Sequence, residues 1–299
     1  MTTGPAGTEQ LPPLVPPSST TGLLEVFRRR YLLRLLVRRE IQARYQGSFL
    51  GLVWSYINPL SQFFIYWFVM GVIMQRGQVE NFAVHVFAGL IVVHFFVETL
   101  NAGTRSIVRN RGVVVKMAVP REMFPVASML VSAFHVVPQL VILLVICLTY
   151  GWRPDPVGMA GIALALVACA LIGTAMALLL SVANVFLRDV SNAVSVLSNF
   201  IRFGVPMVYP FALVQERFGD IGGHDFAQYY LWNPLADAVL LVQRAFWVGT
   251  TPDPAKTEAA NIPPHLMQLG WLCVLFGVVL LVIAQLVFSR TEGRIPEQL

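Results

Sequence analysis

The residues from Arg38 to Leu60, RREIQARYQGSFLGLVWSYINPL, decide the fold, because a cluster of arginines ends there and a long apolar run begins. Seven arginines lie between Arg28 and Arg44, and the next sixty residues hold a single further basic residue. Basic residues at one end of an apolar span are retained on the cytoplasmic side of a membrane. The pattern therefore predicts a membrane protein whose first span begins in the cytoplasm.

The composition also indicates a membrane protein. Of the 299 residues, 56% are apolar and 12% are charged, and the mean hydropathy is +0.67. Soluble domains carry about 25% charged residues, so much of this chain is expected to face lipid. A net charge of +5 can indicate a protein that binds nucleic acid. Here the basic residues flank apolar spans, which favours membrane lipids with anionic headgroups and a cytoplasmic partner instead.

The chain contains six apolar stretches long enough to cross a bilayer as helices, which takes about 20 residues. They run over about 52–74, 82–104, 124–150, 157–186, 190–211 and 268–289. The predicted fold is therefore an all-α membrane domain over residues 51–289, in which Gly204 and Pro206 bend or break the fifth span. Residues 1–22 are rich in Pro, Thr and Gly and predict a flexible tail. Residues 290–299 predict a short C-terminal tail.

Two segments outside these spans are expected to touch the membrane without crossing it. Residues 23–50 predict a surface helix, since Arg30, Arg34 and Arg38 form one stripe and an apolar stripe accompanies it. A generic membrane anchor is the alternative. Residues 226–248 are apolar and aromatic, but polar residues and a proline interrupt them, and the longest apolar piece is too short to cross. They predict short re-entrant helices in the outer leaflet, with two further crossings as the alternative.

The distribution of basic residues predicts the orientation. Placing both termini, the 105–122 loop and the 187–189 turn in the cytoplasm puts 15 of the 21 Lys and Arg residues inside and 5 outside. The excess of basic residues on one side favours this topology over the inverted one.

Several motifs of other protein classes are missing from the sequence. It holds no G-x-x-x-x-G-K-[ST] phosphate loop and no His or Cys cluster of metal-ligand spacing. ATP-driven transport would therefore require ATP and Mg²⁺ to bind a separate ATPase polypeptide. A membrane-embedded polyprenyl-phosphate sugar transferase would need clustered carboxylates, whereas the 16 acidic residues are scattered singly. A secondary transporter would show matching halves with broken helices, and none is evident.

Four blocks of sequence, in order and correctly spaced, resemble one transporter family. They are RREIQARYQGSFLGLVWSYINPL at 38–60, RNRGVVVKMAVPREMFPVA at 109–127, NVFLRDV at 184–190 with VPMVYP at 205–210, and FSRTEGRIPEQL at 288–299. Together they resemble the membrane subunit of bacterial ABC-2-type polysaccharide exporters, which export O-antigen, teichoic acid and galactan. One departure is Arg202, where an uncharged residue is expected.

The resemblance implies a homodimer of six-span subunits in the bacterial plasma membrane, docked on two copies of a cytoplasmic ABC ATPase subunit. It also implies a central channel lined largely by the first and fifth spans. Such a transporter would move a polyprenyl-pyrophosphate-linked glycan, with a galactan or an O-antigen-like polymer as the best guess, from the inner to the outer face. An ABC-2 exporter of a drug or simple lipid is the alternative.

The basic loop over 105–122 is the predicted ATPase-docking segment. A short helix between two spans can receive force from a partner and convert it into rocking of both spans. The alternative is that its basic residues only satisfy the positive-inside rule. The predicted docking residues are Arg109, Arg111, Lys116, Met117, Pro120, Arg121 and Glu122.

Aromatic side chains in the first and fifth spans predict a glycan path. Aromatic faces contact sugar rings without bonds that fix a register, much as they tolerate varied bases in nucleic-acid channels. Ordinary packing against lipid or protein is the alternative for each ring. The predicted channel residues are Tyr56, Phe63, Tyr66, Trp67, Phe200, Arg202, Phe203 and Tyr209.

A further set of arginines predicts a site for the carrier pyrophosphate. Arg38, Arg39 and Arg44 lie where the surface helix meets the first span, and guanidinium groups suit bidentate phosphate contacts. Attraction to any anionic lipid is the alternative.

Polar residues within the spans are costly and therefore usually face protein or water. His94 and Glu98 stand at i, i+4 and can pair on one helix face, with Asn101 nearby and His135 as a candidate neighbour. These four residues predict either structural pairing or a proton relay. Arg202 either faces the channel or pairs with Glu98.

Overall fold

The computed structural model describes residues 22–73, 80–117, 119–219 and 226–298, within which every regular element is helical. The all-α class predicted from the sequence is therefore confirmed. The predicted N-terminal tail lies, apart from Gly22, outside the described residues. The α-helices are α1 Leu23–Arg28, α2 Arg30–Tyr45, α3 Trp54–Tyr66, α4 Phe82–Arg109, α5 Arg111–Lys116, α6 Met123–Thr149, α7 Pro156–Phe186, α8 Val190–Phe203, α9 Phe211–Phe218, α10 Phe226–Tyr230, α11 Pro234–Phe246, α12 Pro254–Asn261, α13 Leu266–Thr291 and α14 Ile295–Gln298.

Four of the described helices, α4, α6, α7 and α13, are long and apolar enough to cross a membrane. They correspond to four of the six predicted spans. The first predicted span coincides with α3 and the π-helical stretch η2 (Trp67–Ile73) that continues it. The fifth coincides with α8, which has 14 residues. α8 ends at Phe203, directly before Gly204, so the predicted break there is confirmed, while six crossings stay a prediction.

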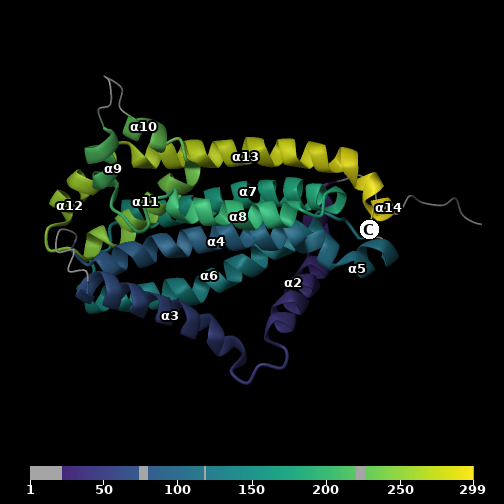
Figure 1. Cartoon of the computed structure of the whole chain (residues 1–299), viewed down its shortest axis with the longest axis horizontal. Coiled ribbons are helices and arrows are strands. Elements are labelled where there is room, and N and C mark those ends of the chain that lie inside the picture. The colour runs from purple at the N-terminus through teal and green to yellow at the C-terminus, as the bar shows by residue number, and fades with distance from the viewer. Residues whose placement is uncertain (1–21, 74–79, 118, 220–225, 299) are drawn as a thin grey trace, which may run out of the picture.

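The bundle is built around α4 (Figure 1). In the most apolar part of α4, 83% of the residues are buried, and the helix packs against α6, α7, α8 and α11. α4 and α7 approach closely through small residues. A Cβ atom added to Gly103 would collide with Ala177, and one added to Gly173 would press on Thr99. Small residues at a helix interface let backbones approach in the absence of a hydrophobic driving force in lipid.

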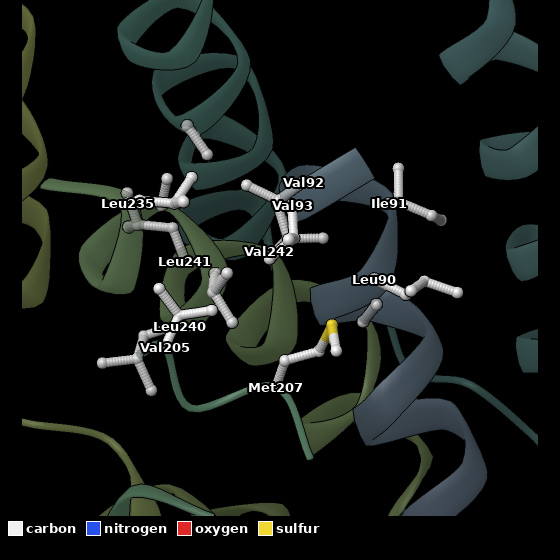
Figure 2. Packing of buried hydrophobic residues seen from close by; sticks show 14 of the residues in the cluster. Leu90, Ile91, Val92, Val93, Val205, Met207, Leu235, Leu240, Leu241 and Val242 are labelled. Atoms are coloured by element: carbon white, nitrogen blue, oxygen red, sulfur yellow. The ribbon is translucent and has the colours of Figure 1, made fainter. Parts of the chain in front are cut away.

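Figure 2 shows where α4 meets α11 and the segment that follows α8. Val92 and Val93 of α4 lie beside Val242 of α11, and Val205 and Met207 lie near Leu240 in the same buried apolar cluster. α11 therefore lies inside the bundle. Its 13 residues extend for ~20 Å at 1.5 Å per residue, which is less than the thickness of a bilayer core. The predicted short helices are thus present, while their re-entrant placement in lipid stays a prediction.

The two ends of the bundle carry different elements (Figure 1). α5 and α14 lie at one end, here called the coupling end. α9, α10 and α12 lie at the opposite end, here called the far end. α13 runs along the edge and packs on α7, and α2 leaves the coupling end at an angle before the chain returns as α3.

The surface helix predicted for residues 23–50 is present as α1 and α2. Val26 and Leu33 are buried against Met123 and Val126 of α6. The predicted apolar stripe faces outward instead, and its side chains are exposed: Leu24, Phe27, Tyr31 and Leu35. Such a face suits lipid contact.

Candidate functional site

The predicted docking segment contains a short helix at the coupling end. α5 buries Val114 among apolar residues that include Ile107 of α4 and Phe124 of α6. Arg111, Lys116 and Met117 are exposed. α5 is therefore anchored through one apolar side and presents a basic and apolar face outward, as a docking helix requires.

The residues that follow α5 bind other parts of this chain. Glu122 is buried, and its carboxylate accepts a hydrogen bond of 3.0 Å from the side-chain amide of Gln285 in α13. The Arg121 guanidinium donates to the backbone carbonyl of Glu292, and Pro120 is half-buried. The carboxylate of Glu122 therefore faces the protein interior rather than the surface on which a partner would dock. Glu122 can therefore position the docking segment but cannot contact a partner directly.

Glu40 of α2 connects the surface helix to the start of the docking segment. Its Oε2 atom lies 2.9 Å from Nη2 of Arg109, and its Oε1 atom lies 3.3 Å from Nη2 of Arg39. The Asn110 amide donates to the same carboxylate over 3.2 Å and accepts a hydrogen bond from Arg39. Arg109, a predicted docking residue, and Arg39, a predicted pyrophosphate ligand, therefore share one carboxylate of their own chain.

The three arginines predicted for pyrophosphate have three different surroundings. Arg39 binds Glu40, and Arg44 pairs with Glu98. Arg38 is exposed and forms no hydrogen bond or ion pair with the described residues. Two of the three guanidinium groups thus already have a carboxylate partner, which competes with an incoming phosphate.

Three of the four predicted polar residues of the spans gather around a cavity of about 260 Å³ between α3, α4 and α6. His94, Glu98 and His135 line it together with Arg44. Nη1 of Arg44 lies 2.8 Å from Oε1 of Glu98. The ion pair of Glu98 is therefore formed with Arg44 and not with Arg202, which had been one of the two arrangements predicted for Arg202.

Hydroxyl groups complete the lining of this cavity. Nδ1 of His135 lies 3.3 Å from the hydroxyl of Tyr45 and 3.4 Å from that of Ser55. Nε2 of His135 is buried and has no partner among the described residues. The cavity therefore offers donors and acceptors of the kind that hold water or sugar hydroxyls. Neither Tyr45 nor Ser55 is among the predicted site residues.

Asn101 lies on the side of α4 that faces α8. Its amide donates to the Ser198 hydroxyl over 2.8 Å and accepts from the Ser195 hydroxyl over 3.3 Å. One turn further, Arg105 donates to Ser195 over 2.7 Å. The serines are not among the predicted site residues. The signal that points to them is the spacing of Ser191, Ser195 and Ser198, which places three hydroxyls on one face of a helix.

Half of the predicted channel residues face outward. The side chains of Phe200 and Phe203 are each 71% exposed. Exposed aromatic side chains of this size on α3 and α8 are available for contact with lipid, a second copy or a substrate. The exposed members of the predicted set are Tyr56, Trp67, Phe200 and Phe203.

The other channel candidates are half-buried. Phe63 packs edge-on against Phe87 with ring centroids 5.3 Å apart. The Tyr209 hydroxyl donates to the Phe203 carbonyl over 3.0 Å and lies 3.2 Å from the hydroxyl of Tyr230. These rings therefore contribute to packing within the chain. Tyr66 also packs against the main apolar cluster.

Arg202 occupies the last turn of α8 and is half-buried. It forms no hydrogen bond or ion pair with any residue that the structure describes, and its charge interacts with His94. Its guanidinium is therefore available to a ligand.

In the described part of the chain, no three His, Cys, Asp or Glu side chains gather as metal ligands would.

Comparison with known proteins decides the family. The sequence profile described as "ABC-2 type transporter" matches residues 31–219. This chain belongs to the ABC-2 type transporter family. The family predicted from the four sequence blocks is thus confirmed, and with four apolar helices of spanning length the transporter is an integral membrane protein.

Relatives of this transporter carry more specific names. It is 24% identical over 268 residues to a protein of Klebsiella pneumoniae named O-antigen export system permease protein RfbA. The alignment covers 89% of this chain and 94% of the relative. It is 29% identical over 229 residues to a protein of the same name from Myxococcus xanthus, covering 77% of this chain and 85% of the relative. The transporter thus aligns with nearly the whole length of named export permeases.

Proposed function

We propose that this chain is the membrane subunit of an ATP-driven exporter for a polyprenyl-pyrophosphate-linked polysaccharide, a galactan or an O-antigen-like glycan. The observation that carries the proposal is the alignment with O-antigen export permeases over 89% of the chain. The exporter moves its substrate from the inner to the outer face of the bacterial plasma membrane. The chain itself is not an enzyme in this proposal.

The motor is a separate ABC ATPase subunit, present in two copies, which binds ATP and Mg²⁺. The support for its docking site is the exposed face of α5, where Lys116 and Met117 point away from the bundle. Val114 anchors α5 to the bundle, so a push on this face moves the ends of α4 and α6. Through Arg109 and Glu40, the same push reaches α2.

The conduit forms between two copies of the chain. Support comes from the exposed aromatic rings on α3, η2 and α8, including Tyr56, Trp67, Phe200 and Phe203. Stacking surfaces of this kind let a polymer of varied sugars pass without a fixed register. The unpartnered guanidinium of Arg202 lies on the same helix as Phe200 and offers hydrogen bonds to sugar hydroxyls.

The coupling end lies in the cytoplasm, and both termini are on that side. α5 and α14 share this end of the bundle (Figure 1), which agrees with the excess of basic residues in the 105–122 loop and in the C-terminal tail. α12 and the neighbouring short helices then face the outside.

Depletion of the protein tests the substrate class. We expect loss of the glycan from the cell surface and accumulation of its lipid-linked form on the cytoplasmic face. Unchanged surface glycan together with accumulation of a drug or simple lipid would refute the polysaccharide assignment. Complementation with the intact gene is the control.

Reconstitution with the partner ABC ATPase subunit tests the docking face. We expect the double variant Lys116→Glu with Met117→Glu to abolish stimulation of ATP hydrolysis, because it reverses the charge and removes the apolar contact. Lys256→Glu in α12, at the far end, is the matched control and should leave stimulation unchanged. Normal stimulation in the double variant would exclude α5 as the docking helix.

A further inference from the structure

A basic cleft lies at the coupling end, beside α5, and it shares Arg111 with the exposed face of that helix. It has a volume of about 730 Å³ and is formed by α4, α5, the α7–α8 turn and Gln298 of α14. Four arginines line it: Arg105, Arg109, Arg111 and Arg188. Arg105 and Arg188 are not among the predicted site residues, because their elements are far apart in the sequence.

The positive charge of the cleft is largely uncompensated. Arg109 pairs with Glu40, and Arg105 donates to the neutral hydroxyl of Ser195. The side chains of Arg111 and Arg188 form no hydrogen bond or ion pair with any described residue, and neither does the carboxylate of Asp189, the acidic neighbour of Arg188 in the sequence.

Among the described residues that line the cleft, the single carboxylate is that of Glu98, at its inner end. Arg44 neutralises it across 2.8 Å. Arg105, Arg111 and Arg188 therefore present three guanidinium groups without a carboxylate partner among the described residues to one open cleft. Like charges repel each other at such sites unless an anion separates them.

The shape of the cleft indicates a ligand that enters the bundle rather than a protein that docks on it. Glu98 and Arg109 of α4 both line the cleft, and they are 11 positions apart, so the cleft extends for ~16 Å along α4 at 1.5 Å per residue. Its wall continues inward through Asn101, which is hydrogen-bonded to the serine stripe of α8. Glu98 also lines the 260 Å³ cavity, so the two spaces adjoin.

The chemistry of the lining selects phosphate. Guanidinium groups bind phosphate oxygens in planar, bidentate pairs and remain charged at any physiological pH. A single phosphate would satisfy one or two of these groups, whereas a diphosphate ester offers enough oxygens and charge for three. The volume exceeds the size of a diphosphate and leaves space for a substituent.

We infer that Arg105, Arg111 and Arg188 form a binding site for the diphosphate group of a diphosphate ester. This inference rests on the proposed function for one of its two sources, a lipid-linked diphosphate carrier. The other source is a soluble nucleoside diphosphate. The site at Arg105, Arg111 and Arg188 replaces the one predicted at Arg38, Arg39 and Arg44, where two of the three guanidinium groups are already paired.

Binding to the full-length protein in phosphatidylcholine nanodiscs tests the site, because neutral lipid offers no competing anionic headgroup. The probe is inorganic pyrophosphate, and calorimetry measures its binding. The buffer contains about 150 mM salt, which screens interactions between exposed surface charges beyond about 8 Å. We expect Arg105→Gln and Arg188→Gln each to weaken binding about tenfold, as loss of a charge-assisted hydrogen bond would. Arg188→Lys should retain part of the affinity.

Two controls make the result specific. Arg153→Gln removes an exposed arginine from the far end, and Arg38→Gln removes one from α2. Neither should change pyrophosphate affinity. Equal losses in Arg153→Gln and Arg188→Gln, or absence of binding to the unaltered protein, would overturn the site. A loss confined to Arg38→Gln would place the phosphate on α2 and would also overturn it. Melting temperatures confirm that each variant is folded.

Competition distinguishes the two sources. Displacement of pyrophosphate by undecaprenyl pyrophosphate in the nanodisc would identify a lipid-linked ligand, whereas displacement by ADP alone would identify a soluble one; either supports the site. Because no export is measured, the outcome is independent of the proposed function. Depletion without effect on any glycan would refute that function and leave a measured diphosphate site standing.

Discussion

Oε2 of Glu40 lies 2.9 Å from Nη2 of Arg109, and this ion pair joins the surface helix α2 to the end of the central helix α4. Asn110, the next residue, binds the same carboxylate and begins the turn into α5. A displacement of α5 therefore reaches α2 through one carboxylate, without passing through the apolar core. This arrangement connects α5, the proposed docking helix, directly to the helix that leads into α3.

Neutralising Glu40 should uncouple the two helices. Because the Arg109 side chain is 49% exposed, solvent screens the pair, and we expect Glu40→Gln to cost only about 1 kcal/mol of stability. The larger effect should be on ATPase-coupled transport. Melting temperature and ATP turnover in the reconstituted complex measure the two separately. The exchange of both charges, Glu40→Arg with Arg109→Glu, should restore part of the transport. Full coupling in Glu40→Gln would contradict this connection.

The Arg44–Glu98 pair, which stands between the basic cleft and the inner cavity, should behave as a coupled unit. Removing one partner leaves the other charge unpaired at membrane depth. We therefore expect Arg44→Ala and Glu98→Ala each to lower the melting temperature, and the double variant to lower it by less than their sum. Since the Arg44 side chain is 45% exposed, the coupling energy should be about 0.5–1 kcal/mol. Strictly additive losses would show that the pair is not formed.

The spans that could be predicted from the sequence are those set by local composition. An apolar run such as 157–186 partitions into lipid whatever its neighbours are, and α7 covers Pro156–Phe186. Its start is local too, because the Asp155 carboxylate accepts hydrogen bonds from the amides of Val157 and Gly158. The break after α8 follows from Gly204 in the same way.

The partners of the charged residues could not be predicted, because they depend on how distant segments pack. The i, i+4 spacing placed His94 and Glu98 on one face of α4. The cation that pairs with Glu98 is nevertheless Arg44, which belongs to α2 and lies 54 residues earlier in the sequence. Glu122 reads as a surface residue in a basic loop, but it is buried against Gln285 of α13. No pattern within the loop reveals that contact.

The exposed rings of α8 should matter for polymer movement more than other exposed rings do. We expect Phe200→Ala with Phe203→Ala to lower glycan export several-fold while the protein remains folded and inserted. Trp271→Ala with Phe276→Ala is the matched control, because those side chains are 65% and 51% exposed on α13. Pulse-labelled glycan reaching the cell surface is the measurement. Equal export by both double variants would remove α8 from the glycan path.

Gly103 should be intolerant of any larger side chain. A Cβ atom at this position collides with Ala177, so Gly103→Leu forces α4 away from α7. Overpacking of this kind costs about 1–3 kcal/mol or more, and we expect a lower melting temperature and a lower yield of folded protein. Gly293→Leu is the control, because a Cβ atom there has no neighbour within 4 Å. If the two variants were equally stable, the close α4–α7 contact would be in error.

Cysteine labelling should reveal the two sides of the membrane. Cys147, Cys169 and Cys273 are free and buried, so the unaltered protein should resist a membrane-impermeant maleimide. In the proposed orientation the far end is outside, so Lys256→Cys in α12 should react in intact spheroplasts. Val115→Cys in α5 should react only after lysis. Labelling of Val115→Cys in intact spheroplasts would invert the orientation, and a cytoplasmic ATPase could then not reach α5.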